Sequence, residues 1–183
     1  MKIRYLSDLH LEFLKPTVVH KFLKQIPLPT SDEICVLTGD IGNIHRSKES
    51  YDIFMKFISK NFKKTFVITG NHEYYNNLHT IPQTNLIMTD YFKQFDNISF
   101  LNNTVEVYDN HCFIGSTMWS NIIDFRYKIN DVKDIPNFNC SAYNELNTVC
   151  VDFLKESIGK NDNCVVIPQF YSHADSWYDV NLI

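Results

Sequence analysis

The pentapeptide Thr69-Gly70-Asn71-His72-Glu73 decides the fold, because a predicted buried strand runs directly into it. Residues 65–69, Thr-Phe-Val-Ile-Thr, form the β-branched and aromatic run that is typical of a buried strand. Gly70 then lets the backbone turn tightly. The polar residues that follow are therefore placed at the carboxyl end of a strand, which is the edge where open α/β sheets carry their ligand sites.

Two earlier segments have the same arrangement. Residues 2–7 predict a strand that leads into Asp8 and His10, and residues 33–38 predict a strand that leads into Gly39-Asp40-Ile41-Gly42-Asn43. Because Asp8 and His10 are two residues apart, we expect them on the same side of an extended segment. Carboxylate, imidazole and amide oxygen ligands together suit divalent cations such as manganese, iron or zinc.

The remaining chain predicts helices between these strands and a strand-rich second half, which indicates a second sheet packed on the first. Helices are expected over 18–25, 47–63, 82–95 and from Ser141 to a stop at Gly159, and strands over 98–101, 104–108, 111–116 and 163–167. Residues 121–139 are polar and aperiodic, and we expect a long loop that is either functional or mobile.

Composition narrows the class of protein. A chain of 183 residues with 44% apolar residues predicts one packed globular domain, 1–183. A nucleic-acid partner stays possible but is not indicated by the net charge of −4. The five cysteines are odd in number and include no Cys-X-X-Cys pair, which predicts reduced thiols inside the cell. Because Met1 leads straight into the first strand and no apolar run approaches the ~20 residues that span a bilayer, we expect a cytoplasmic protein with no membrane partner.

The three strand-end segments, in this order and spacing, resemble the calcineurin-like metallophosphoesterases. Residues 113–119, Phe-Ile-Gly-Ser-Thr-Met-Trp, also look like a segment of bacterial and phage members. The resemblance extends over residues 1–167 and leaves 168–183 as a divergent tail. It implies an α/β fold: an α/β/β/α sandwich of two mixed β-sheets flanked by helices, here with a shortened C-terminal part.

The resemblance implies a metal-dependent phosphoesterase, a phosphatase or phosphodiesterase that uses a water activated at a dinuclear site. Two divalent ions are expected, manganese, iron, zinc or magnesium. The implied ligands are Asp8 and His10 for the first ion, Asn71 for the second, and Asp40 as the bridge between them. The expected substrate is a small-molecule or nucleotide phosphomonoester or phosphodiester, and its identity stays open.

The resemblance also implies a general acid, His72, which would protonate the leaving oxygen. Its imidazole could be oriented by Asp8 or by Glu73, and Asn43 is expected to touch the substrate phosphate.

Late in the chain the resemblance ends. Family members follow the strand at 165–167 with a Thr-His pair and later with a Gly-His-X-His segment, whereas this chain has Pro168-Gln169 and stops at Ile183. Three explanations stay open. His173 or Asp175 substitutes as a ligand, the tail has an unrelated origin, or the chain is a catalytically reduced binding or scaffold module with this fold. Two further expectations stay open: that the site binds one ion instead of two, and that a dimer covers an open sheet edge.

Overall fold

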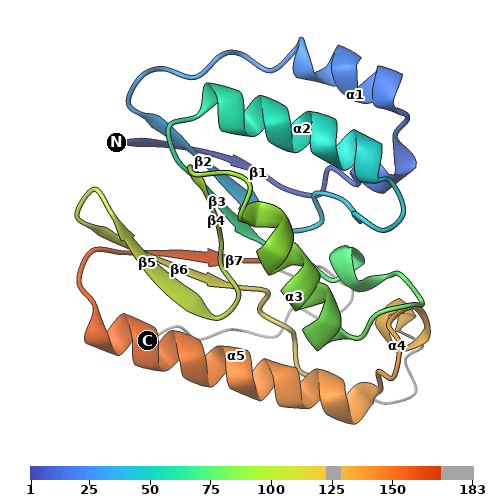
Figure 1. Cartoon of the computed structure of the whole chain (residues 1–183). Coiled ribbons are helices and arrows are strands. Elements are labelled where there is room, and N and C mark those ends of the chain that lie inside the picture. The colour runs from blue at the N-terminus through green and yellow to red at the C-terminus, as the bar shows by residue number, and fades with distance from the viewer. Residues whose placement is uncertain (123–128, 170–183) are drawn as a thin grey trace.

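The described part of the chain, residues 1–122 and 129–169 of a computed structural model, forms four layers (Figure 1). The first sheet consists of β1 (Lys2–Leu6), β2 (Glu33–Thr38), β3 (Thr65–Ile68) and β4 (Ile98–Phe100). The second consists of β5 (Thr104–Tyr108), β6 (His111–Ser116) and β7 (Cys164–Pro168). The outer layers are α1 (Pro16–Leu23), α2 (Lys48–Asn61) and α3 (Ile81–Phe92) on one side and α5 (Cys140–Lys160) on the other. The predicted sandwich is confirmed.

Strand order explains why the polar strand ends meet. The first sheet has the order β1-β2-β3-β4 and is parallel throughout, because a helix crosses over between successive strands. The second sheet is mixed, since β5 and β6 are antiparallel whereas β6 and β7 are parallel. Mixed pairing was expected in both sheets and is found only in the second. The carboxyl ends of β1, β2 and β3 therefore lie at one edge of the first sheet.

Successive side chains of β2 point to opposite faces of the first sheet, as the period of a strand requires, and so enter two different hydrophobic clusters. Ile34 and Val36 point into the layer between the two sheets, where they join Phe66 and Phe113. The intervening side chains of β2 point to the opposite face, where they pack under α1, α2 and α3. Because β2 is buried on both faces, its end is fixed firmly, and so is the loop that follows it.

The second half differs from the sequence-based expectation in two places. The segment expected to be a loop contains a short helix, α4 (Asn130–Asp134). Helix α5 begins at Cys140 because the Asn139 side chain accepts the backbone N–H of Ala142 at 3.0 Å. It continues through Gly159 to Lys160, so the predicted stop at Gly159 is wrong. A glycine that ends a helix adopts positive φ, whereas Gly159 does not: within the described residues positive φ among the glycines is found at Gly39, which follows β2.

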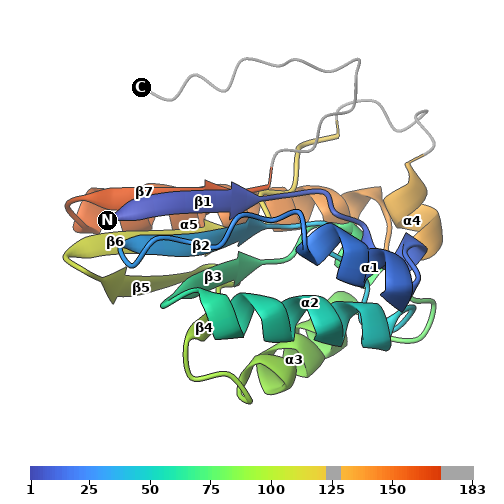
Figure 2. The same ribbon diagram turned by 90° about the horizontal axis from the view of Figure 1, so that it is seen from above.

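Two further features concern the surface and the thiols. β1 and β7, the edge strands of the two sheets, lie on the same side of the molecule (Figure 2). All five cysteines are free, and Cys35, Cys112 and Cys150 are buried. Among the helices in residues 1–122 and 129–169, none is both long and apolar enough to cross a membrane.

Candidate metal centre

The loops after β1 and β2 run side by side beyond the sheet. The backbone N–H of Asp8 donates to Gly39 O at 3.2 Å, and that of His10 donates to Asp40 O at 3.0 Å. Leu11 continues the ladder with a bond to Ile41 O. This pairing holds two predicted ligand-bearing loops in register where the strands have already ended.

Three side chains of these loops converge, and each carries an atom that can bind a metal ion. One ligand atom each from Asp8, His10 and Asp40 lies within 4.8 Å of the others. All three residues have positive φ, 53°, 47° and 50°, so the segment is not extended and the expected strand alternation is not what aligns them. Left-handed backbone costs on the order of 1–3 kcal/mol for a residue with a side chain, and such strain concentrates at functional sites.

Asp40 lies at the centre of the site. It is 5% exposed, and its Oδ1 accepts the backbone N–H of His72 at 3.0 Å. Burial raises the pKa of Asp40, while the His72 N–H, the His72 ring and the Gln169 side chain hold back that rise. Asp8, by contrast, is exposed, so the site is open to solvent on that side.

The Glu73 carboxylate joins the loop after β2 to the loop after β3. Its Oε1 accepts the backbone N–H groups of Ile41 at 2.8 Å and Gly42 at 3.3 Å. Its Oε2 accepts those of Gly70 at 2.7 Å and Asp40 at 3.1 Å. A carboxylate has about four acceptor sites, and these four donors fill them. Burial and then repulsion from Asp40 raise the pKa of Glu73 to about 8, and the N–H donors oppose the rise.

The buried acids bear on whether a cation fits. Asp40 and Glu73 are both nearly inaccessible, both have raised pKa values, and their charges repel each other. A divalent cation held by Asp40 would relieve that repulsion. Together with the oxygen and imidazole donors of Asp8 and His10, this environment fits a hard or borderline metal ion.

Asn71 is held by a partner that the sequence did not indicate. Its Nδ2 donates to Asp131 Oδ1 at 2.9 Å and to the Tyr75 hydroxyl at 2.6 Å. The Tyr75 hydroxyl also donates to Asp131, at 3.1 Å. Because a carboxylate only accepts, Asp131 fixes the amide with its nitrogen toward α4. Asp131 is fully buried and lies in the segment expected to be a loop, so periodicity gave no signal for it.

Gln169 lies in the site, although the sequence marked it as a departure from the family pattern. It is 5% exposed, and its side-chain amide bonds to Asp40. A Cβ added at Gly70 would collide with Gln169 Oε1 and Nε2, so the amide fills the space beside that glycine. An amide oxygen is a metal ligand of the same type as that of Asn71. His173 and Asp175 lie outside the described residues.

His72 has a different partner from the two predicted. Its Nδ1 lies 3.4 Å from Glu12 Oε1, whereas the Glu73 carboxylate is taken up by backbone N–H groups. The ring packs on Tyr75 with the centroids 4.5 Å apart. Burial lowers the pKa of His72, but the hydrogen bond to Glu12 and the charge of Asp40 outweigh it, so the pKa lies above its ordinary value.

Asn43, expected to touch substrate phosphate, is 1% exposed in this structure. Its Nδ2 donates to the carbonyls of His72 and Tyr75, both at 2.9 Å, and its Oδ1 accepts the N–H of His45 at 3.0 Å. The amide thus joins the loop after β2 to the loop after β3. Its described contacts support the loop that carries His72.

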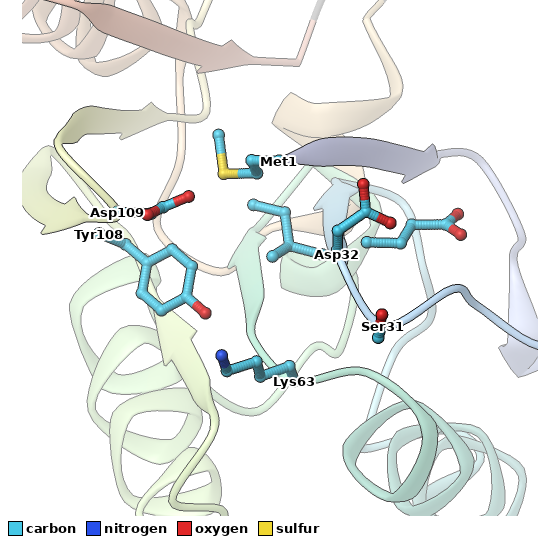
Figure 3. Close-up of a pocket in the computed structure, with 8 residues that line it drawn as sticks. Met1, Ser31, Asp32, Lys63, Tyr108 and Asp109 are labelled. Atoms are coloured by element: carbon cyan, nitrogen blue, oxygen red, sulfur yellow. The ribbon is translucent and has the colours of Figure 1, made fainter.

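A separate cavity of about 490 Å³ lies at the other end of the sheets (Figure 3). Met1 and Asp32 precede β1 and β2, and Asp109 lies in the turn between β5 and β6. Lys63 faces these acids across the cavity. The cavity therefore lies near the amino ends of β1 and β2, remote from the convergent ligands at the carboxyl ends of those strands.

Gly70 offers a test of how tightly the centre is packed. We expect Gly70→Ala to lower the free energy of unfolding by about 1–3 kcal/mol, because its methyl group would overlap Asp40 Oδ1 and the Gln169 amide. The matched control is Gly159→Ala in α5, where an added Cβ meets nothing within 4 Å. This control should instead stabilise the chain by about 0.5–1 kcal/mol. Urea unfolding measures both, and equal midpoints for the two variants would contradict the packing described.

Two comparisons with known proteins bear on the family of this chain. The chain matches the family model described as calcineurin-like phosphoesterase over residues 1–180. It is also 31% identical, over 185 aligned positions, to an uncharacterized protein of Acanthamoeba polyphaga mimivirus. That alignment covers 90% of this chain and 65% of the viral protein.

Because the match covers nearly the whole sequence, the chain belongs to the calcineurin-like phosphoesterase family. The match also reaches past residue 167, into the stretch set apart above as a divergent tail. The chain spans 65% of the length of the viral relative.

Proposed function

We propose that this chain is a metal-dependent hydrolase of a phosphomonoester or phosphodiester, with two divalent ions at the carboxyl ends of β1, β2 and β3. The observation that carries the proposal is the convergence of Asp8, His10 and Asp40 within 4.8 Å of one another on strained, cross-linked loops.

The proposed ligands divide between two ions. Asp8 and His10 would hold the first ion, and Asp40 would serve both ions, because it follows β2, the strand between β1 and β3. Asn71, which follows Gly70, and Gln169, whose amide abuts Gly70, would supply amide oxygens for the second ion. When bound, such ions polarise the phosphoryl oxygens and lower the pKa of water enough to make it a nucleophile at neutral pH.

His72 is the proposed general acid. Its ring is half-buried beside the centre, and its raised pKa favours the protonated form that can donate a proton to the leaving oxygen. The hydrogen bond from its backbone N–H to Asp40 fixes the distance between the acid and the metal-binding loops. The proposed partner is a small-molecule or nucleotide phosphoester that reaches the centre from the exposed Asp8 side.

The test compares two monoesters, p-nitrophenyl phosphate and phenyl phosphate, with bis(p-nitrophenyl) phosphate as the diester. Hydrolysis should disappear on chelation and return with Mn²⁺. His72→Ala should slow phenyl phosphate hydrolysis by about 10²-fold or more while leaving the bound metal unchanged. Its effect on p-nitrophenyl phosphate should be smaller, because that leaving group needs less protonation.

The matched control is His20→Ala, since His20 is an exposed histidine on α1 and should be dispensable. Equal losses of phenyl phosphate hydrolysis in His72→Ala and His20→Ala would show that His72 takes no part in the reaction. Metal binding by the native chain without turnover of any of these esters would contradict the enzyme and favour the alternative, a catalytically reduced binding module with the same fold.

A further inference from the structure

Glu12 is a buried acid next to the metal centre to which the sequence assigned no role. It lies in a short 3-10 helix, η1 (Leu11–Phe13), directly after His10, and its side chain is 1% exposed. Its Oε1 lies 3.3 Å from His10 Nδ1 and 3.4 Å from His72 Nδ1. One carboxylate oxygen thus contacts two imidazoles that come from different strand ends.

The second carboxylate oxygen holds Glu12 in place. Glu12 Oε2 accepts the backbone N–H of Asn43 at 3.2 Å, which joins η1 to the loop after β2. A buried carboxylate is costly unless charged or polar partners surround it. The two imidazoles and this N–H are those partners, so the burial of Glu12 and the placement of the histidines depend on each other.

The contacts determine which ring nitrogen of each histidine is available for chemistry. A neutral imidazole carries one N–H, and a carboxylate at Nδ1 selects the form that is protonated there. His10 is then left with a lone pair on Nε2, which is what a metal ligand needs. Protonated His72 is left with Nε2–H, which is what a general acid needs. The rings lie edge to face with their centroids 4.4 Å apart, so both can reach the same carboxylate.

We propose that Glu12 is a positioning residue that fixes His10 and His72 through their Nδ1 atoms and so couples metal binding to proton donation. The catalytic half of this role rests on the proposed function, whereas the orientation of the two imidazoles does not. A direct ligand role is the competing explanation, since Glu12, His10 and His72 also have atoms within 4.8 Å of one another. The two explanations make different predictions for metal content.

The first test uses metal-free protein and needs no activity. Long-range ¹⁵N–¹H spectra of the histidine side chains, recorded at a pH where both imidazoles are neutral, report the tautomer of each ring. In the native chain His10 and His72 should both carry Nδ1–H. In Glu12→Ala both should shift toward Nε2–H, with a smaller shift in Glu12→Gln, whereas His20 should not change. Native-like tautomers for both rings in Glu12→Ala would overturn the proposal.

The second test measures Mn²⁺ binding by dialysis and elemental analysis. Glu12→Gln should weaken Mn²⁺ binding by about 10–100-fold without changing the number of ions bound at saturation. Loss of an ion at saturation, as expected for Asp8→Asn, would instead make Glu12 a ligand and overturn the positioning role. Glu49→Gln, an exposed acid at the start of α2, is the matched control.

The third test is a double-mutant cycle with phenyl phosphate at saturating Mn²⁺. If Glu12 acts through His72, Glu12→Gln should slow the native enzyme but add little to the loss in His72→Ala. Full multiplication of the two losses would show that Glu12 acts independently of the acid and would overturn the coupling. If the native chain hydrolyses nothing, the proposed function fails, and the spectra still decide whether Glu12 orients the imidazoles.

Discussion

Glu73→Ala is expected to lower the free energy of unfolding by about 3–5 kcal/mol, among the largest stability losses available in this chain. The substitution removes the acceptor of four backbone N–H groups, and water cannot easily replace it because Glu73 is 2% exposed. An unsatisfied buried donor costs about 1–3 kcal/mol, so even partial rearrangement leaves a large penalty. Removal of the buried acid itself offsets part of that penalty.

Urea unfolding followed by circular dichroism measures this loss. The matched control is Glu156→Ala on α5, an exposed acid paired with Lys160, which should leave the unfolding midpoint close to that of the native chain. Similar midpoints for Glu73→Ala and Glu156→Ala would mean that the Glu73 carboxylate does not hold the loops after β2 and β3 together.

Asp40→Asn is expected to abolish metal-dependent hydrolysis, a loss of about 10³-fold or more, while the fold is retained. Asparagine tolerates the left-handed backbone at this position, where φ is 50°, and its amide oxygen can still accept the His72 N–H. What it lacks is the negative charge that the two proposed ions share. The variant should therefore melt near the native temperature and bind fewer Mn²⁺ ions.

Asp109→Asn is an unusually close control for Asp40→Asn. Asp109 is exposed in the turn between β5 and β6, has φ 49°, and lines the cavity near the amino ends of β1 and β2. The chemical change and the backbone conformation are the same, and only the location differs. Native rates and native metal content are expected for Asp109→Asn. Equal activity in the two variants would exclude Asp40 from the metal centre.

The order of elements and the identity of the strand ends could be predicted because both are local properties. Each predicted strand of the first sheet is a β-branched or aromatic run that stops at a glycine or a polar residue, as at Gly39 and Gly70. Parallel pairing then follows from the helices between them, and it brings Asp8, His10 and Asp40 together. The exact backbone of these loops could not be predicted, because positive φ at Asp8 and His10 has no sequence signal of its own.

The supporting acids could not be found in this way, because their roles depend on contacts between distant segments. Glu12 contacts His72, which is 60 positions away in the sequence, and the same separation lies between Asp131 and Asn71. The sequence offered no signal for the role of Glu12. Asp131 also had none, since the segment around α4 shows no period. Gln169 was noticed as a missing histidine, and its placement beside Asp40 is a tertiary result.

The most direct test of the central claim is the number of metal ions bound per chain. The protein is stripped with a chelator, dialysed against Mn²⁺, freed of excess metal and measured by elemental analysis, with Asp40→Asn and Asp109→Asn in parallel. The proposed centre predicts two ions in the native chain and in Asp109→Asn, and fewer in Asp40→Asn. A native chain that binds no Mn²⁺, or that binds as much after Asp40→Asn as before, would contradict a metal centre at the ends of β1, β2 and β3.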